Sequence, residues 1–123
     1  MSWKLDNDRA IYLQLIEEIQ MRVVAGFYKP GSKLPSVREL AAEAAVNPNT
    51  MQKAFSELEG SGLIITIRTS GRMVTEDTTM IQDLRKKLAF EEVRLFFEKM
   101  KQYGFNNQEI IDLIKSSMKG DEQ

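Results

Sequence analysis

The sequence contains no cysteine and no histidine among its 123 residues. Without cysteine there is no disulfide, no thiolate metal site and no cysteine nucleophile. Without histidine, the commonest metal ligand and the commonest general base are both missing. There is no phosphate loop of the Gly-Lys-Ser/Thr kind, and adjacent carboxylates such as Glu91 and Glu92 do not face each other on a helix. We therefore expect no enzyme, no catalytic residue, no cofactor and no metal.

Long apolar runs are also missing. No stretch approaches the roughly 20 apolar residues that a membrane helix needs, and no secretory signal is visible. These absences predict a cytoplasmic protein with no membrane partner. The length allows one compact domain plus an appendage, and the apolar share of 42 % is ordinary for a globular protein.

The formal net charge of -1 hides local differences along the chain. Residues 1–75 carry nine Lys/Arg and eight Asp/Glu, whereas residues 76–123 carry eight and ten. Phosphate binding depends on the local electrostatic field rather than on the net charge of the chain. A basic cluster that is merely solvated is, however, about as common as one that binds phosphate. Two segments, 19–38 and 60–75, contain basic residues and no acid: Arg22, Lys29, Lys33 and Arg38 in the first, Arg68 and Arg72 in the second.

The first two predicted helices are marked by periodicity and capping residues. Apolar residues recur every four positions over 10–24, which predicts an amphipathic helix packed on a core. Pro30 and Gly31 then predict a turn over 29–32. Ser36 is followed by Glu39 at the capping-box spacing, so we expect a second helix over 37–44.

A break of about three residues precedes the third predicted helix. Asn47 is a natural cap and Pro48 suits the first helical position, so this helix should cover 48–59. Gly60 and Gly62 are expected to stop it. Short β-branched stretches at 63–67 and 72–75, joined by a turn at 68–71, predict a hairpin.

The composition changes after Thr75, and a junction is expected over 76–80. A long helix over 79–103 and a final helix capped by Asn106 should follow. The predicted fold class is mainly α with a small β-hairpin wing. It consists of a winged helix-turn-helix DNA-binding domain, residues 1–75, followed by two C-terminal helices in a dimerisation element, residues 76–123.

The start of the third helix carries polar residues suited to DNA. The N-terminal part of a recognition helix meets base edges in the major groove, where Asn and Gln can pair with adenine and Thr can contact a thymine methyl. The alternatives are a simple helix cap with a solvated polar face, or a winged helix used for protein contacts, which an acidic third helix would have signalled. The candidate DNA-binding residues here are Asn47, Asn49, Thr50, Gln52 and Lys53.

Three stretches resemble the winged-helix domain of GntR-family regulators: LPSVRELA at 34–41, VNPNTMQKAF at 46–55 and LEGSGLI at 58–64. The resemblance extends over about residues 8–75 and implies double-stranded operator DNA as the partner. It implies that Arg38 grips a phosphate and can reach a base, and that Ser36 approaches the backbone. It also places Pro48 in the recognition segment and Arg68, Ser70, Gly71 and Arg72 on a wing at the DNA.

The wing departs from the family pattern, which is usually Arg-Gly-x-Gly-Thr-Phe-Val. Arg68 and Gly71 fit, but Thr69 replaces the first glycine, and Arg72 and Met73 replace the Thr-Phe pair. The wing backbone is therefore expected to enter the minor groove less deeply. The charge of Arg72 could compensate.

The remaining 48 or so residues resemble the short two-helix extension of the YtrA subfamily. That resemblance implies a dimerisation element, and a repressor of genes for ABC transport or envelope stress. Helices this apolar cannot stay exposed on a small domain, so they pack on their own winged helix or, as we favour, on a second copy reading a palindrome. The sequence identifies no small-molecule effector. The expected interface residues are Leu88, Phe90, Val93, Phe96, Phe97 and Met100.

Overall fold

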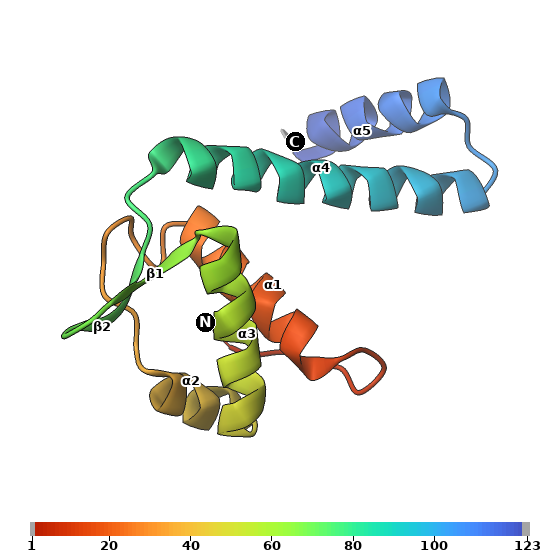
Figure 1. Ribbon diagram of the computed structural model, residues 1–123. Coiled ribbons are helices and arrows are strands. Elements are labelled where there is room, and N and C mark those ends of the chain that lie inside the picture. The colour runs from red at the N-terminus through yellow and green to blue at the C-terminus, as the bar shows by residue number, and fades with distance from the viewer. Residues whose placement is uncertain (1, 122–123) are drawn as a thin grey trace. The chain divides into compact units, whose positions relative to one another are not determined.

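The computed structural model of the protein describes residues 2–121 (Figure 1). The elements in chain order are α1 (Ile11–Val24), α2 (Val37–Ala44), α3 (Pro48–Ser61), β1 (Ile64–Ile67), β2 (Gly71–Val74), α4 (Thr78–Gln102) and α5 (Asn107–Asp121). The chain forms two compact units, divided after Arg85 within α4. Within the described residues, no helix is long and apolar enough to cross a membrane.

The core of the first unit lies between its three helices and the hairpin. Helix α3 packs against α1, α2 and β1, which makes it the central element of this unit. Ile81, in the first turns of α4, is also buried in this core, and Leu84 packs against it. The compact unit therefore continues beyond the junction expected after Thr75. Its most deeply buried apolar side chains include Leu15, Ile19, Leu40, Met51, Phe55, Leu58, Ile64 and Val74.

The helix starts follow the predicted caps, but one predicted stop is wrong. The Ser36 hydroxyl accepts the Glu39 N–H at 3.1 Å while the Glu39 carboxylate accepts the Ser36 N–H at 3.3 Å, which completes the capping box. The side chain of Asn47 caps α3, with Pro48 at the first position. Gly60 does not stop α3, which continues to Ser61. The left-handed residue that ends the helix is Gly62, with φ +86°.

The hairpin is antiparallel, with Thr66 opposite Arg72 and Ile67 opposite Gly71. The residues that follow the turn predicted over 29–32 also pair with β2. Lys33 forms a bridge with Met73, and the N–H of Leu34 donates to the carbonyl of Arg72 at 2.8 Å. The wing is therefore fastened to the first unit along the outer side of β2.

Arg22 departs from its expected place in a basic surface segment. Its side chain is 1 % exposed and lies inside the first unit. Its guanidinium donates to Glu18 at 2.9 Å, to the Tyr28 hydroxyl at 2.8 Å and to Glu43 of α2 at 3.3 Å. Its Cζ atom also lies 4.2 Å from the centroid of the Trp3 ring. We call these five residues the Arg22 cluster; Arg22 adds little to the positive surface.

The second unit is a helical hairpin made by the rest of α4 and by α5. Asn106 and Glu109 form the predicted capping box, with bonds of 2.9 and 3.0 Å, at the start of α5. Ile110 is fully buried in this unit. Gly104, with φ +94°, provides the left-handed residue in the connection.

The turn between α2 and α3 contains a non-glycine residue in the left-handed region: Ala45 has φ 58° and ψ 46°. This conformation costs an L-residue about 1–2 kcal/mol, more than glycine loses in chain entropy. We predict that Ala45→Gly raises the free energy of unfolding by roughly 0.5–1 kcal/mol. Urea denaturation would measure it. The control Ala42→Gly, at an exposed helical position of α2, should instead lower stability by about 1 kcal/mol. Equal losses in both variants would refute the strain at Ala45.

Candidate nucleic-acid interface

Helix α2 and the start of α3 lie at the same end of the first unit, and the hairpin projects beside them (Figure 1). Arg38 is exposed on the first turn of α2. Ser36 caps that helix, and its hydroxyl oxygen accepts the Glu39 N–H. A hydroxyl that accepts one bond still has a proton to donate, so Ser36 can donate to a phosphate while it caps the helix.

The cap of α3 restricts what Asn47 can do. Its Oδ1 atom accepts the N–H of Asn49 at 2.7 Å, so that oxygen is already engaged. Bidentate pairing with adenine needs both the oxygen and the nitrogen of an amide. Asn47 can therefore offer DNA its amide nitrogen as a donor. Both the cap and the DNA contact considered from the sequence are compatible with this geometry, with the contact made by donation from the amide nitrogen.

Asn49, Gln52 and Lys53 are exposed on α3, and Gln52 and Lys53 lie three and four positions after Asn49, on its side of the helix. The Gln52 amide donates to the Ser56 hydroxyl at 3.3 Å. The Lys53 ammonium lies 3.7 Å from the centroid of the Tyr12 ring, a cation–π contact with α1. Asn49 and Gln52 thus present amides, whereas Lys53 presents a positive charge beside an aromatic ring.

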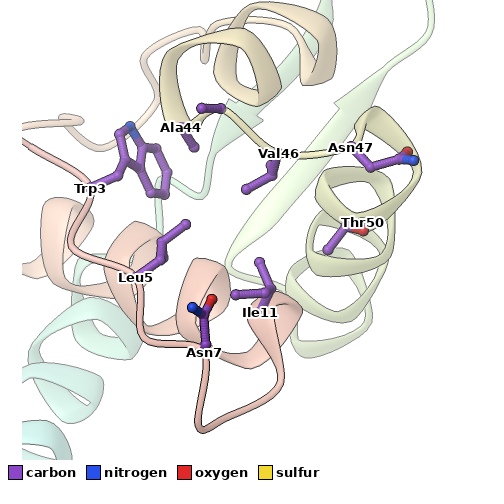
Figure 2. Close-up of a pocket in the computed structure, with 9 residues that line it drawn as sticks. Trp3, Leu5, Asn7, Ile11, Ala44, Val46, Asn47 and Thr50 are labelled. Atoms are coloured by element: carbon purple, nitrogen blue, oxygen red, sulfur yellow. The ribbon is translucent and has the colours of Figure 1, made fainter.

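Thr50 is half-buried and borders a pocket of about 460 Å³ (Figure 2). Trp3 and Leu5 form one side of the pocket, Ile11 of α1 another, and the α2–α3 turn the third. None of the lining side chains is charged. The structure therefore places Thr50 at the edge of the polar α3 face rather than at its centre. Pro48 is exposed beside it.

The wing residues divide into two groups. Arg68, Ser70 and Gly71 are exposed at the turn, and Gly71 has φ +88°, where a side chain would strain the backbone. Arg72 instead points toward α3. Its Nε atom donates to Glu59 at 2.6 Å, and its Cζ atom lies 5.3 Å from the centroid of the buried Phe55 ring. Arg68, Ser70 and Gly71 therefore lie together at the exposed turn, whereas the side chain of Arg72 is directed to α3.

Lys33 is a functional candidate that the sequence-based site did not include. It is exposed, and its Cε atom lies 3.7 Å from the position that a Cβ at Gly71 would occupy. Its ammonium therefore adds charge close to the turn of the wing. The acid-free segment 19–38 was the available signal, but composition does not show which of its basic residues reach the wing and which are buried.

Three helices, a short break before the third and a pairing hairpin after it define a winged helix-turn-helix protein. A sequence profile described as "Bacterial regulatory proteins, gntR family" matches residues 11–74. The HTH-type transcriptional regulator YhcF of Bacillus subtilis (strain 168) is 37 % identical over 120 residues, which are 98 % of this chain and 99 % of YhcF. The chain belongs to the GntR family of bacterial regulators, and it is a DNA-binding transcriptional regulator.

Two further similarities support this assignment. The HTH-type transcriptional repressor YtrA of the same strain is 46 % identical over 74 residues, 58 % of this chain and 57 % of YtrA. A solved structure of a GntR family transcriptional regulator from Listeria monocytogenes is 38 % identical, with a TM-score of 0.83, covering 91 % of this chain and 98 % of that chain. The family and these relatives are regulators, which confirms the expectation that the chain is not an enzyme.

We predict that Arg38→Ala weakens DNA binding without reducing folding stability, because Arg38 is exposed. If it contacts one phosphate, the slope of log affinity against log salt concentration should fall in magnitude by about 0.9. Fluorescence titrations at several salt concentrations would measure that slope. Arg94→Ala, which removes an arginine paired with Glu91 and Glu98 in the second unit, is the matched control. An unchanged slope for Arg38→Ala would exclude the phosphate contact.

Proposed function

We propose that the protein is a repressor that binds a palindromic operator as a homodimer. In this proposal α3 enters the major groove, where Asn49 and Gln52 read base edges and Asn47 donates from its amide nitrogen. Ser36 and Arg38 bind the phosphate backbone, and Arg68 and Ser70 bring the wing tip to the flanking minor groove. Pro48, Thr50, Lys53 and Gly71 complete the DNA-facing surface. The exposed, non-acidic face at the start of α3 supports the base-reading part.

The homodimer rests on one observation, the apolar side chains that the second unit leaves exposed. Phe90 is 72 % exposed, Val93 52 % and Phe96 42 %. Leu88, Phe97 and Met100 are half-buried, and Phe96 and Phe97 form an edge-to-face pair with centroids 6.1 Å apart. Helix α5 adds further exposed apolar residues: Ile111, Leu113, Ile114 and Met118.

Apolar surface gathered on the two helices of the second unit favours burial in an interface, since monomeric proteins rarely expose large apolar patches. A second copy is the occupant we propose. One winged helix reads few base pairs, whereas two copies related by a two-fold axis read both halves of a palindrome and combine their free energies through tethering. The remaining alternative is that these side chains pack on the chain's own first unit, which would leave a monomer.

Repression is proposed because the relative YtrA is an HTH-type transcriptional repressor. The regulated genes that we propose, an operon for ABC transport or envelope stress, rest on the resemblance to the YtrA subfamily. A reporter driven by the promoter next to the protein's own gene tests repression, and the genes that this promoter drives test the proposed operon. Loss of the protein should raise expression, and a fall in expression would identify an activator instead.

We predict that Asn49 and Gln52 determine sequence preference and that Lys53 supplies charge. Alanine variants at Asn49 or Gln52 should relax selection at particular base pairs, by roughly 1–3 kcal/mol each. Lys53→Ala should weaken binding to all sequences alike. Selection of bound sites from a random DNA library, performed with each variant, would measure this. Identical preferences for all three variants would refute the division of roles, and no enrichment by the intact protein would favour a winged helix used for protein contacts.

We predict that the double variant Phe90→Asp/Phe96→Asp is monomeric, because it places two carboxylates on exposed apolar positions of α4. Both side chains are exposed, so the helical hairpin itself should survive, as circular dichroism would show. The control Lys99→Asp/Gln102→Asp adds carboxylates at exposed polar positions of the same helix and should remain dimeric. Analytical ultracentrifugation measures the assembly. A monomeric wild-type protein that binds its operator tightly would refute the dimer.

A further inference from the structure

The carboxylate of Glu59 contacts both strands of the wing at once. One of its oxygens accepts the Thr66 hydroxyl of β1 at 2.7 Å, and the other accepts the Arg72 Nε–H of β2 at 2.6 Å. Thr66 and Arg72 are directly opposite each other in the hairpin register. Glu59 belongs to the second half of α3. These three residues, which we call the wing cluster, therefore join both strands of the wing to the recognition helix.

The ion pair of the wing cluster is partly shielded from solvent, whereas Thr66 is exposed. The side chains of Arg72 and Glu59 are 26 % and 30 % exposed, so their ion pair is less open to solvent than an ordinary surface pair. The hydrogen bond from Thr66, and then that from Arg72, hold the pKa of Glu59 below its ordinary value. The carboxylate therefore remains charged near neutral pH. The Arg72 guanidinium also lies 5.3 Å from the ring centroid of Phe55, which is fully buried in the core.

The contact with Glu59 makes the charge of Arg72 less available to a phosphate of DNA. The Nε–H of Arg72 is engaged with the Glu59 carboxylate by a short charge-assisted hydrogen bond, and that carboxylate offsets the positive charge that a phosphate would meet. At the tip of the wing, Arg68 and Ser70 are exposed. The orientation of that tip relative to α3 depends on the contacts that hold β1 and β2. The wing cluster supplies one such contact to each strand.

We propose that Arg72 is a positioning residue, which with Glu59 and Thr66 sets the orientation of the wing against α3 and does not itself contact DNA. This inference rests on the proposed function, because it requires the wing tip to reach the minor groove. It replaces the compensating charge that the sequence suggested for Arg72. In this wing Thr69 replaces the first glycine of the family pattern. Arg72, which also departs from that pattern, is the residue that holds the wing to α3.

The test uses the full-length protein and the DNA site that it enriches from a random library. Arg72→Met should weaken binding roughly 3- to 30-fold, as expected for loss of a coupled contact, with the salt slope unchanged. Arg68→Met, at the exposed wing tip, is the matched control and should lower the slope by about 0.9. Both variants should lose preference at the same flanking base pairs. An Arg72→Met slope that falls as far as that of Arg68→Met would overturn the proposal.

Two double variants separate positioning from contact. Glu59→Arg/Arg72→Glu reverses the ion pair and should regain most of the affinity lost in Arg72→Glu, whereas a lost DNA contact would leave the two equally weak. If these charge variants fail to fold in thermal melts, the milder Glu59→Gln/Arg72→Met pair decides. It should bind no more weakly than Arg72→Met alone, and additive losses would overturn the proposal.

Failure of the proposed function has a different signature. If the intact protein enriches no DNA sequence, sequence-specific binding is wrong, and the positioning role falls with it. If sites are enriched but Arg68→Met changes neither affinity nor slope, the wing does not reach DNA. In that case base reading by α3 survives, and the role of Arg72 is overturned.

Discussion

The first unit depends on the burial of one cation, Arg22. Burial by itself would lower the pKa of this guanidinium, but hydrogen bonds from it to Glu18 and Tyr28, among others, outweigh that effect and raise the pKa above its ordinary value. A charge removed from water costs several kcal/mol unless its partners are in place. Glu43 is one of these partners, so the position of α2 relative to α1 is coupled to Arg22. Trp3, stacked on the same guanidinium and bonded to Glu43 at 3.0 Å, extends the coupling to the N-terminal segment.

The two polar clusters have complementary places in this unit. The Arg22 cluster fastens α2, the helix that exposes Arg38, and the wing cluster fastens both strands of the hairpin to α3. The apolar core of the same unit includes Phe55 and Leu58 of α3, both buried. A core of this kind supplies most of the stability, whereas hydrogen bonds and ion pairs supply direction. The segments that we propose to face DNA are therefore held by directional contacts at the margins of the apolar core.

Local signals account for the parts of the fold that were predicted correctly. The capping box of Ser36 and Glu39 and the Asn47-Pro48 start depend on residues one to three positions apart, so they can be read from the chain alone. Gly60 and Gly62 are both possible helix ends in the sequence, and in the structure Gly62 adopts the left-handed conformation that ends α3. The exposed amides of Asn49 and Gln52 likewise follow from helical spacing.

By itself, the sequence determined the order of elements, the caps, the helix-turn-helix break and the polar face of α3, because each depends on neighbours along the chain. The tertiary structure decided which charges are available to a partner. Arg22 and Arg38 occur in the same acid-free segment, yet one is buried and the other exposed. Arg72 belongs to an acid-free segment of the sequence, yet in the structure its side chain pairs with Glu59, thirteen positions away. The physical reason is that an ion pair depends on the path of the chain in space, which no local pattern specifies.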